Sequence, residues 1–288
     1  TVLVRNTSKA RNLLGPGVNI LEHGLDEDNL VSALEGSDLV INLAGSPIAT
    51  IWTKKRKREH RDSRVGITQL LVDSMKKCKN PPKLLISGSA VGYYGNRGDD
   101  ILTESSKPGT GFLPELCKEW EYSAIEAESN GARVCLLRTG IVLGREGGML
   151  NTMGQLFEMN LGTYTGSNQY VPWIHITDMV RIIGECITNE SLSGPINCTA
   201  PSPVRNKEFA FTLKKITGAK FLIPIPPFLV RPLLGESTEI LTNSQNAVPK
   251  LLEQRGFKFN YTNLNQALNT EFSYGNVTIE KYKRENTE

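Results

Sequence analysis

Leu84-Leu-Ile-Ser-Gly-Ser-Ala-Val-Gly-Tyr-Tyr-Gly95 decides the fold class of this 288-residue chain. The stretch begins as an apolar run and ends abruptly in small hydroxylated residues, glycines and two tyrosines. A continuous apolar run of this length is typical of a strand that is buried on both faces of a parallel sheet. Ligands of open α/β sheets bind at the carboxyl ends of the strands, so we expect Ser89, Tyr93 and Tyr94 to border a ligand site.

Strand and helix patterns alternate on both sides of this stretch. The predicted strands are 1–5, 38–45, 83–87 and 133–138, and the predicted helices are 26–35, 53–78 and 113–130. The alternation predicts an α/β fold with a doubly wound, parallel, Rossmann-type sheet.

The pattern loosens after Gly148. Here the predicted helices are 149–158, 177–189, 206–218, 247–255 and 264–272, the predicted strands are 173–175 and 195–199, and 221–228 is a predicted Pro-rich turn. We expect Thr177 and Asn206 to cap the helices that they begin. This part of the chain is predicted to form a smaller, partly discontinuous lobe over the carboxyl edge of the sheet.

Composition narrows the function classes. A net charge of +3, 39% hydrophobic residues and 22% charged residues are typical of a globular protein without a nucleic-acid surface. The five cysteines include no Cys-x-x-Cys pair, which argues against a disulfide framework and against a metal site. No apolar run is long enough to span a bilayer. We therefore expect an intracellular protein, cytoplasmic or mitochondrial, with no nucleic-acid or membrane partner.

Two further segments invite functional interpretations. The basic run Lys54–Arg58 lacks interleaved aromatic residues and is followed by Glu59 and Asp62, so we interpret it as an exposed helix face rather than an RNA-binding patch. The segment Phe221–Leu234 is either an apolar surface for a partner or a segment that packs against the sheet.

Two motifs carry a family resemblance. Ser89-Ala-Val-Gly-Tyr-Tyr-Gly95 and Pro172-Trp-Ile-His-Ile-Thr-Asp178 resemble the extended short-chain dehydrogenase/reductase superfamily. The whole chain is similar to the atypical, epimerase-like, NADP-binding branch of that superfamily, the NAD-dependent epimerase/dehydratase-like proteins.

The resemblance begins one β-α unit late. No glycine-rich phosphate loop lies ahead of Arg5, and the first strand looks like the second strand of the family. The resemblance therefore implies that roughly 25–30 residues precede Thr1, the size of the rest of a βαβ unit. Without them, a gap is expected between two apolar strands at the centre of the sheet.

The resemblance also implies a division into domains. Residues 1–147 with 175–199 would form a Rossmann-type dinucleotide-binding domain that lacks its first β-α unit. Residues 148–174 with 200–277 would form the substrate lobe, and residues 278–288 a polar tail.

The implied cofactor is NADP. Arg5 ends the first strand, where a basic residue suits the 2′-phosphate of NADP, although an ordinary surface Arg fits the position too. The residues that match cofactor-binding positions of the family are Val4, Arg5, Leu43, Ala44, Gly45, Glu59, Arg64 and Val142. Taken alone, Glu59 and Arg64 fit solvated helix charges, and Val142 fits core packing.

The catalytic residues of the family match only in part. Typical members use Ser with Tyr-x-x-x-Lys, in which the Lys lowers the pKa of the phenol. Ser89 fits the serine position, but Pro114 stands four residues before Lys118 where Tyr is usual. Tyr93 or Tyr94 could substitute, or both could simply pack at the mouth of the sheet.

Pro172–Asp178 holds one of three histidines in the chain. His175 either faces the substrate cleft beside Trp173 or is a structural imidazole at a strand-to-helix junction. Arg205 and Asn206 either bind substrate or cap the helix that follows. The candidate catalytic residues are Ser89, Tyr93, Tyr94 and His175, and no metal is expected.

Two functions remain open. The first is an NADP-dependent oxidoreductase or epimerase that acts on a hydroxyl or carbonyl carbon of a small molecule. The second is a catalytically silent NADP-binding regulatory or assembly factor, which the missing Tyr-x-x-x-Lys favours. A homodimer is compatible with both.

Overall fold

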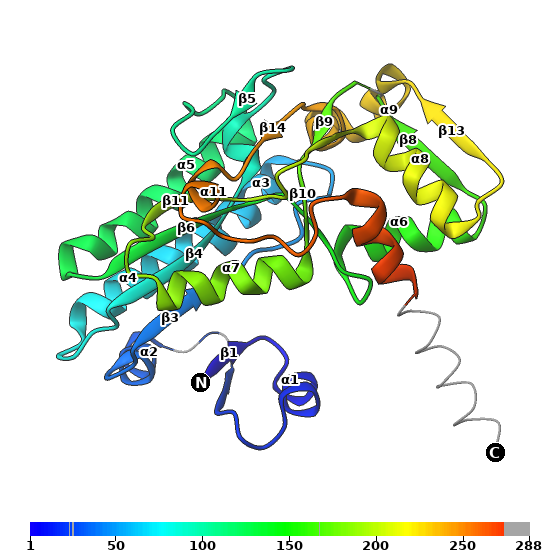
Figure 1. The fold of residues 1–288 in the computed structure, drawn as a ribbon. Coiled ribbons are helices and arrows are strands. Elements are labelled where there is room, and N and C mark those ends of the chain that lie inside the picture. The colour runs from blue at the N-terminus through cyan, green and yellow to red at the C-terminus, as the bar shows by residue number, and fades with distance from the viewer. Residues whose placement is uncertain (23, 25, 167, 274–288) are drawn as a thin grey trace, which may run out of the picture.

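A four-stranded parallel sheet forms the centre of the molecule. The computed structural model describes residues 1–22, 24, 26–166 and 168–273. The strand order is β11-β6-β4-β3, and every neighbouring pair is parallel (Figure 1). The bounds are Leu39–Asn42 for β3, Leu84–Ala90 for β4, Arg133–Thr139 for β6 and Gly194–Cys198 for β11. The predicted parallel, Rossmann-like α/β fold is confirmed.

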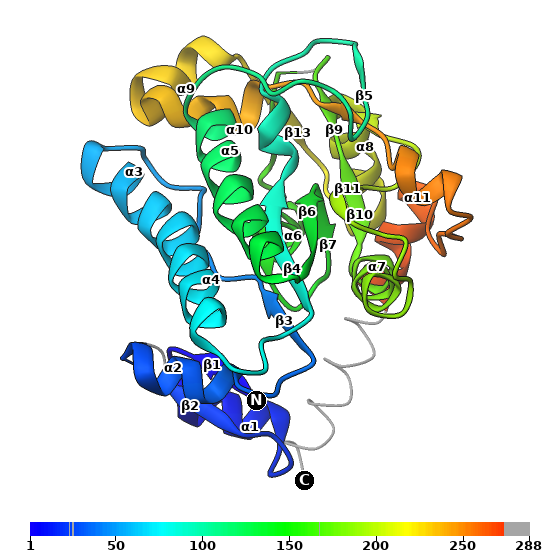
Figure 2. The ribbon, with the colours of Figure 1, turned by 90° about the vertical axis from the view of Figure 1, so that its left-hand side faces the viewer.

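Helices cover both faces of this sheet (Figure 2). Helices α2 (Glu27–Leu34), α4 (Ile67–Lys77) and α5 (Phe112–Ile125) lie on one face, and α7 (Ile176–Thr188) with α11 (Lys250–Gln254) lies on the other. Alternate side chains of β4 enter the two cores, Leu85 toward α4 and Ile86 toward α7. This alternation follows from the period of two in a strand, and it places Ser87 and Ser89 on the same side as Leu85.

The predicted helix 53–78 is continuous but not uniform. Thr53 caps α3 (Lys54–Arg61) by accepting a hydrogen bond from the amide of Arg56. A π-helical turn, Asp62–Gly66, then joins α3 to α4. A π-turn widens the helix by one residue and re-aims the side chains on it. Arg64, a predicted cofactor residue, lies in this turn.

The N-terminal strand belongs to a separate small sheet. Strand β1 (Val2–Val4) pairs in parallel only with β2 (Ile20–Glu22), and helix α1 (Thr7–Leu14) connects them. Strand β3 pairs only with β4, so no described strand links β1 to the main sheet. The sheet is thus interrupted between β1 and β3, where the gap was expected (Figures 1 and 2). The sequence pattern did not predict α1 or β2.

The second half of the chain builds the lobe. Its helices are α6 (Gly148–Glu158), α8 (Asn206–Thr217), α9 (Pro227–Leu234) and the helix 264–273. Its paired strands are β8 (Gly162–Thr165) with β13 (Leu222–Ile225), and β9 (Tyr170–Val171) with β12 (Val204–Arg205). A core of its own, which includes Phe157, Phe209 and Leu268, holds these elements together.

Short elements connect the lobe to the sheet. Strand β7 (Ile141–Leu143) pairs with β10 (Trp173–His175), and β5 (Ile101–Leu102) pairs with β14 (Asn246–Ala247). The 3-10 turn η2 (Val91–Tyr94) follows β4, while η4 (Gly235–Thr238) and α10 (Glu239–Thr242) follow α9. Among the described residues, no helix is both long and apolar enough to cross a bilayer.

Three local predictions were wrong. The predicted Pro-rich turn at 221–228 is instead strand β13 and the start of α9, because proline is tolerated at an edge strand and in the first turn of a helix. Helix α7 is capped by His175 rather than Thr177, since the His175 ring accepts a hydrogen bond from the Thr177 amide. Arg205, not Asn206, occupies the cap position of α8, and the Asn206 side chain donates to the carbonyl of Thr165.

Candidate functional site

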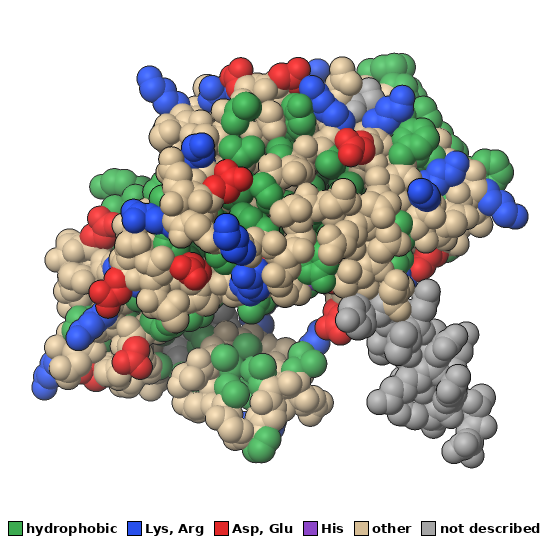
Figure 3. Space-filling model, viewed as in Figure 1, with side chains coloured by type: hydrophobic (Ala, Val, Ile, Leu, Met, Phe, Trp, Pro, Cys, Tyr) green, Lys and Arg blue, Asp and Glu red, His purple; other side chains and the backbone are tan. Residues whose placement is uncertain are grey.

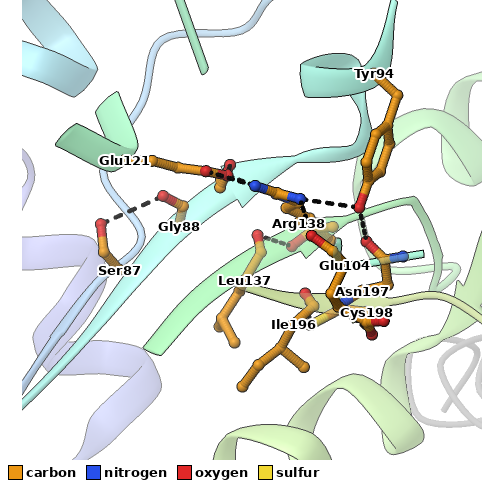
Figure 4. A network of polar contacts seen from close by, with 12 residues as sticks. Ser87, Gly88, Tyr94, Glu104, Glu121, Leu137, Arg138, Ile196, Asn197 and Cys198 are labelled. Atoms are coloured by element: carbon orange, nitrogen blue, oxygen red, sulfur yellow. Dashed lines mark hydrogen bonds and ion pairs between the residues drawn. The ribbon is translucent and has the colours of Figure 1, made fainter. Parts of the chain in front are cut away.

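A buried polar network lies at the carboxyl end of β4 (Figure 4). The hydroxyl of Ser89 donates a hydrogen bond of 2.6 Å to Oε1 of Glu121, a residue of α5. Both side chains are buried between the sheet and α5. We call Ser89, Tyr94, Glu121, Arg138 and Asn197 the Arg138 network, because the Arg138 side chain joins its parts.

Arg138 is the second-last residue of β6 and forms a bidentate ion pair with Glu121. Its Nε and Nη2 lie 2.8 Å from the two carboxylate oxygens. Burial alone would lower the pKa of Arg138, but the Glu121 carboxylate more than offsets it and the pKa is raised. A carboxylate paired in this way only accepts hydrogen bonds. The Ser89 proton therefore points at Glu121, and the Ser89 oxygen can act toward a substrate only as an acceptor.

Tyr94 is the second tyrosine of the motif, and its hydroxyl is fully engaged. The hydroxyl donates to Oδ1 of Asn197 at 2.6 Å and accepts from Nη1 of Arg138 at 3.1 Å. The side chain is completely buried, and burial raises the pKa of Tyr94 to about 12. At neutral pH this phenol stays protonated and links the turn after β4 to β6 and β11.

Tyr93 lies in a different environment. It is half-buried, its ring stacks on the Arg138 guanidinium at 3.5 Å, and it meets the Tyr94 ring edge-on at 5.4 Å. Its hydroxyl makes no hydrogen bond to any residue that the structure describes. The contact with the guanidinium holds the Tyr93 ring in place.

The helix that normally supplies Tyr and Lys presents other side chains here. Lys118 is exposed on α5. The residues of α5 nearest to Gly92 are Leu113 and Cys117. Burial raises the pKa of the Cys117 thiol to about 12, so the thiol is neutral. The Arg138 network therefore contains no lysine, and the described contacts of the Tyr93 ring are to Arg138 and Tyr94.

Four predicted cofactor residues meet at the end of β3. Leu43, Ala44 and Gly45 follow the strand, and Leu43 and Gly45 are exposed. The Arg64 guanidinium packs on this loop and donates to the carbonyl of Ser46 at 2.8 Å. A Cβ at position 45 would lie 3.0 Å from Cζ of Arg64, so glycine permits this approach. The loop thus offers exposed backbone beside a fixed cation.

Buried His60 anchors the same loop to α3. Its ring nitrogens contact the hydroxyls of Ser46 at 2.8 Å and Thr50 at 3.2 Å. Burial lowers the pKa of His60, which keeps the ring neutral. The loop after β3 is therefore a fixed surface.

The remaining predicted cofactor residues are not gathered at this loop. Glu59 pairs with Arg56 on the surface of α3. Val142 is half-buried on β7, level with Ile174 of β10. Val4 and the exposed Arg5 lie at the end of β1, in the separate small sheet.

His175 lies beside the helix 264–273 and is not part of the Arg138 network. Its Nδ1 accepts from the Thr177 amide, so the ring proton resides on Nε2, which lies 2.9 Å from Oε1 of Glu271 without good hydrogen-bond alignment. The ring stacks on Tyr261 at 3.7 Å. Only 2% of His175 is exposed. This geometry fits a structural imidazole that fastens the C-terminal segment.

Sequence reasoning missed Glu121, Arg138 and Asn197. A signal was present for two of them. Arg138 ends a buried strand, and Glu121 follows Cys117 and Trp120 at helical spacing on the buried face of α5. A charged residue in such a position needs a buried partner. Asn197 carried no comparable signal.

Comparisons with known proteins agree with this fold. The model of the NAD dependent epimerase/dehydratase family matches residues 1–198, and that of a domain of unknown function matches residues 225–271. The chain is 38% identical over 274 residues to the chloroplastic epimerase family protein SDR39U1 homolog of Arabidopsis thaliana, covering 93% of this chain and 78% of the relative. It is 40% identical over 239 residues to an epimerase family protein of Mycobacterium leprae, covering 82% and 77%.

A solved structure is similar along almost its whole length. The crystal structure of human epimerase family protein SDR39U1 (isoform2) with NADPH superposes with a TM-score of 0.82 at 28% identity, covering 94% of this chain and 98% of that one. The family match spans more than half of the chain. The chain therefore belongs to the NAD dependent epimerase/dehydratase family.

Proposed function

We propose that this protein binds NADPH across the carboxyl edge of β3 and β1. The human relative was solved with NADPH, and this chain has exposed backbone at Leu43–Gly45 beside the fixed cation of Arg64. Arg5 would meet the 2′-phosphate, and Val142 would lie near the nicotinamide. Val4, Ala44 and Glu59 would complete the contacts.

We further propose that the protein is an oxidoreductase or epimerase of small molecules. The bound cofactor would supply hydride exchange with a carbon that bears a hydroxyl or carbonyl group. Of the two tyrosines, Tyr93 suits proton transfer better, because the Tyr94 hydroxyl is buried and already bonded. Tyr93 would exchange the proton of the substrate oxygen, and the Ser89 oxygen would accept a hydrogen bond from the substrate hydroxyl.

The observation that carries this proposal is that one guanidinium, Arg138, both pairs with Glu121, the hydrogen-bond acceptor of Ser89, and stacks on the Tyr93 ring. These contacts hold the Tyr93 phenol and the Ser89 hydroxyl at the carboxyl end of β4. We expect Tyr93→Phe and Ser89→Ala each to reduce turnover about 10²–10⁴-fold, the usual contribution of a positioned acid or base. NADPH affinity, measured by fluorescence titration, is expected to stay unchanged in both variants.

The test follows NADPH absorbance with a panel of small ketones and aldehydes, and NADP⁺ with secondary alcohols. Tyr94→Phe is the matched control, since it deletes a hydroxyl from the neighbouring ring and should act through stability. Equal loss of turnover in the two Tyr→Phe variants would contradict the role given to Tyr93. Arg5→Asp should weaken NADPH binding while sparing NADH.

The catalytically silent factor is the second candidate. One observation favours it, since Leu113 and Cys117 are the α5 residues beside Gly92, in the turn after β4, and Lys118 is exposed. Tight NADPH binding without turnover of any carbonyl compound would support this candidate and oppose the enzyme.

A further inference from the structure

Most residues of the segment 220–236 are exposed, and the others are half-buried. It comprises β13, α9 and the residues around them, and none of its residues is buried. Five large apolar side chains in it are 55–72% exposed: Phe221, Ile223, Phe228, Leu229 and Leu233. Contiguous apolar surface of this kind on a folded protein marks a site of interaction. We call residues 220–236 the β13–α9 corner.

Basic residues outnumber acidic residues in and around this corner, whose one acidic residue, Glu236, is paired with Lys57. Between Glu208 and Glu236 the sequence contains four basic residues, Lys214, Lys215, Lys220 and Arg231, and no acidic residue. None of the four forms an ion pair with a described residue. Figure 3 shows apolar side chains with Lys and Arg side chains around them on this part of the molecule. The surface is therefore suited to a partner that is both apolar and anionic.

Helix α9 carries its large apolar side chains and its basic side chain on different sides. Phe228, Leu229 and Leu233 lie within one face at helical spacing, and Arg231 lies to the side of that face. Helices that lie in a membrane interface carry aromatic and aliphatic side chains on the buried face and basic residues at its border. The corner projects at the end of the molecule opposite to α1 (Figures 1 and 2).

We propose that the β13–α9 corner binds the surface of an anionic lipid bilayer. The apolar side chains would enter the boundary between headgroups and acyl chains, and the cations would meet the lipid phosphates. This binding needs no spanning helix. It runs against the sequence-based expectation of no membrane partner, which rested on the absence of a spanning run.

A second copy of this chain fits the corner less well. Two copies related by a two-fold axis would bring the same unpaired cations face to face, and such like-charge contacts oppose association. The apolar side chains also stand on a projecting surface, and Phe228, Leu229 and Leu233 line neither the cavity beside Phe211 nor the one beside Pro227. A flat, deformable lipid surface suits this shape better than a rigid groove.

The test is co-sedimentation of the full chain with vesicles. We expect binding to equal parts phosphatidylcholine and phosphatidylglycerol, and weaker binding to phosphatidylcholine alone or in high salt. The double variant Phe228→Ser/Leu233→Ser removes two large apolar side chains and should lower the partition coefficient at least about tenfold. Lys220→Gln and Arg231→Gln should each lower it about fivefold, on anionic vesicles only.

Two control variants test whether exposed side chains elsewhere on the molecule also contribute to vesicle binding. Leu13 on α1 is 73% exposed, close to the 72% of Leu233, so Leu13→Ser should bind vesicles like the unchanged protein. Lys118→Gln, an exposed cation on α5, should also have no effect. Circular dichroism of each variant confirms that the fold is retained.

Three outcomes would overturn the proposal. The unchanged protein could remain in the supernatant with anionic vesicles, which would leave an acidic protein surface as the occupant. Phe228→Ser/Leu233→Ser could bind as strongly as the unchanged protein. Sedimentation velocity without lipid could show a dimer that this double variant abolishes, which would assign the corner to a second copy.

Discussion

At the scale of single residues, Arg138 and Glu121 depend on each other. Both are almost completely buried, so removing either leaves an uncompensated charge in the core. We expect Arg138→Met to lower the free energy of unfolding by about 3–5 kcal/mol, and Arg138→Met/Glu121→Leu to recover most of that loss. Urea unfolding of Arg138→Met, Glu121→Leu and the double variant measures the coupling energy between the two residues. The exposed pair Arg61–Glu119 is the control, and Arg61→Met should cost less than about 1 kcal/mol.

His175 gives a residue-scale prediction about pH. Burial lowers its pKa below 6.5, and Glu271 offsets this only in part. Below pH 6.5 the unfolded chain therefore binds a proton that the folded protein resists. The stability from neutral His175 is complete above that value and is lost as the pH falls through it. We expect His175→Gln to flatten the decline of the thermal midpoint between about pH 7.5 and 5.5.

A second buried histidine, His60, also contributes to the loss of stability at low pH. Its pKa is also lowered by burial, so the His175 variant should retain part of the acid sensitivity. An unchanged slope in His175→Gln would show that the ring does not contribute.

At the scale of elements, the packing of α5 on β4 depends on Gly88. A Cβ at this position would lie 2.8 Å from Cζ2 of Trp120. The Trp120 ring is fixed by a hydrogen bond of 3.0 Å from its Nε1 to the Thr68 hydroxyl, so it has little freedom to withdraw. We expect Gly88→Ala to cost about 1–3 kcal/mol through overpacking.

A second substitution tests that cause. Trp120→Phe removes the ring atoms that meet the added methyl group, so Gly88→Ala should cost less in the Trp120→Phe background. Urea unfolding of the four proteins gives the coupling energy. An equal cost in both backgrounds would point to backbone effects of glycine instead.

The elements also show how far sequence reasoning extends. Strands β3, β4 and β6 were predictable, because strands buried on both faces are continuous apolar runs. Strand β2 and helix α1 were missed, because short elements with few buried residues carry weak periodicity. The position of Ser89 at a strand end was predictable, but its bond to Glu121 was not. That bond depends on how α5 packs on the sheet, which spacing along the chain does not encode.

At the scale of the whole molecule, the interrupted sheet is the dominant feature. Strands β1 and β3 each pair on one side only. Leu3, Ile41 and Leu43, on or beside these strands, are exposed apolar residues. Arg5 follows β1, on one side of the interruption, and Leu43–Gly45 follow β3, on the other side. All of them are predicted to contact the cofactor. NADPH binding as proposed therefore requires that the two sheets share one carboxyl edge, which a parallel strand between them would provide.

This leads to a prediction for the sheet as a unit. We expect a chain extended ahead of Thr1 by a glycine-rich β-α unit to be more stable than residues 1–288. The gain should reach at least about 2 kcal/mol, the contribution of burying one large apolar side chain, and NADPH should bind more tightly. An extension of equal length with proline in the middle of the strand is the control, since proline cannot donate to the ladder. If both extensions leave urea unfolding and NADPH titration unchanged, the space between β1 and β3 is not a position for a strand, and Arg5 loses its proposed place beside the cofactor.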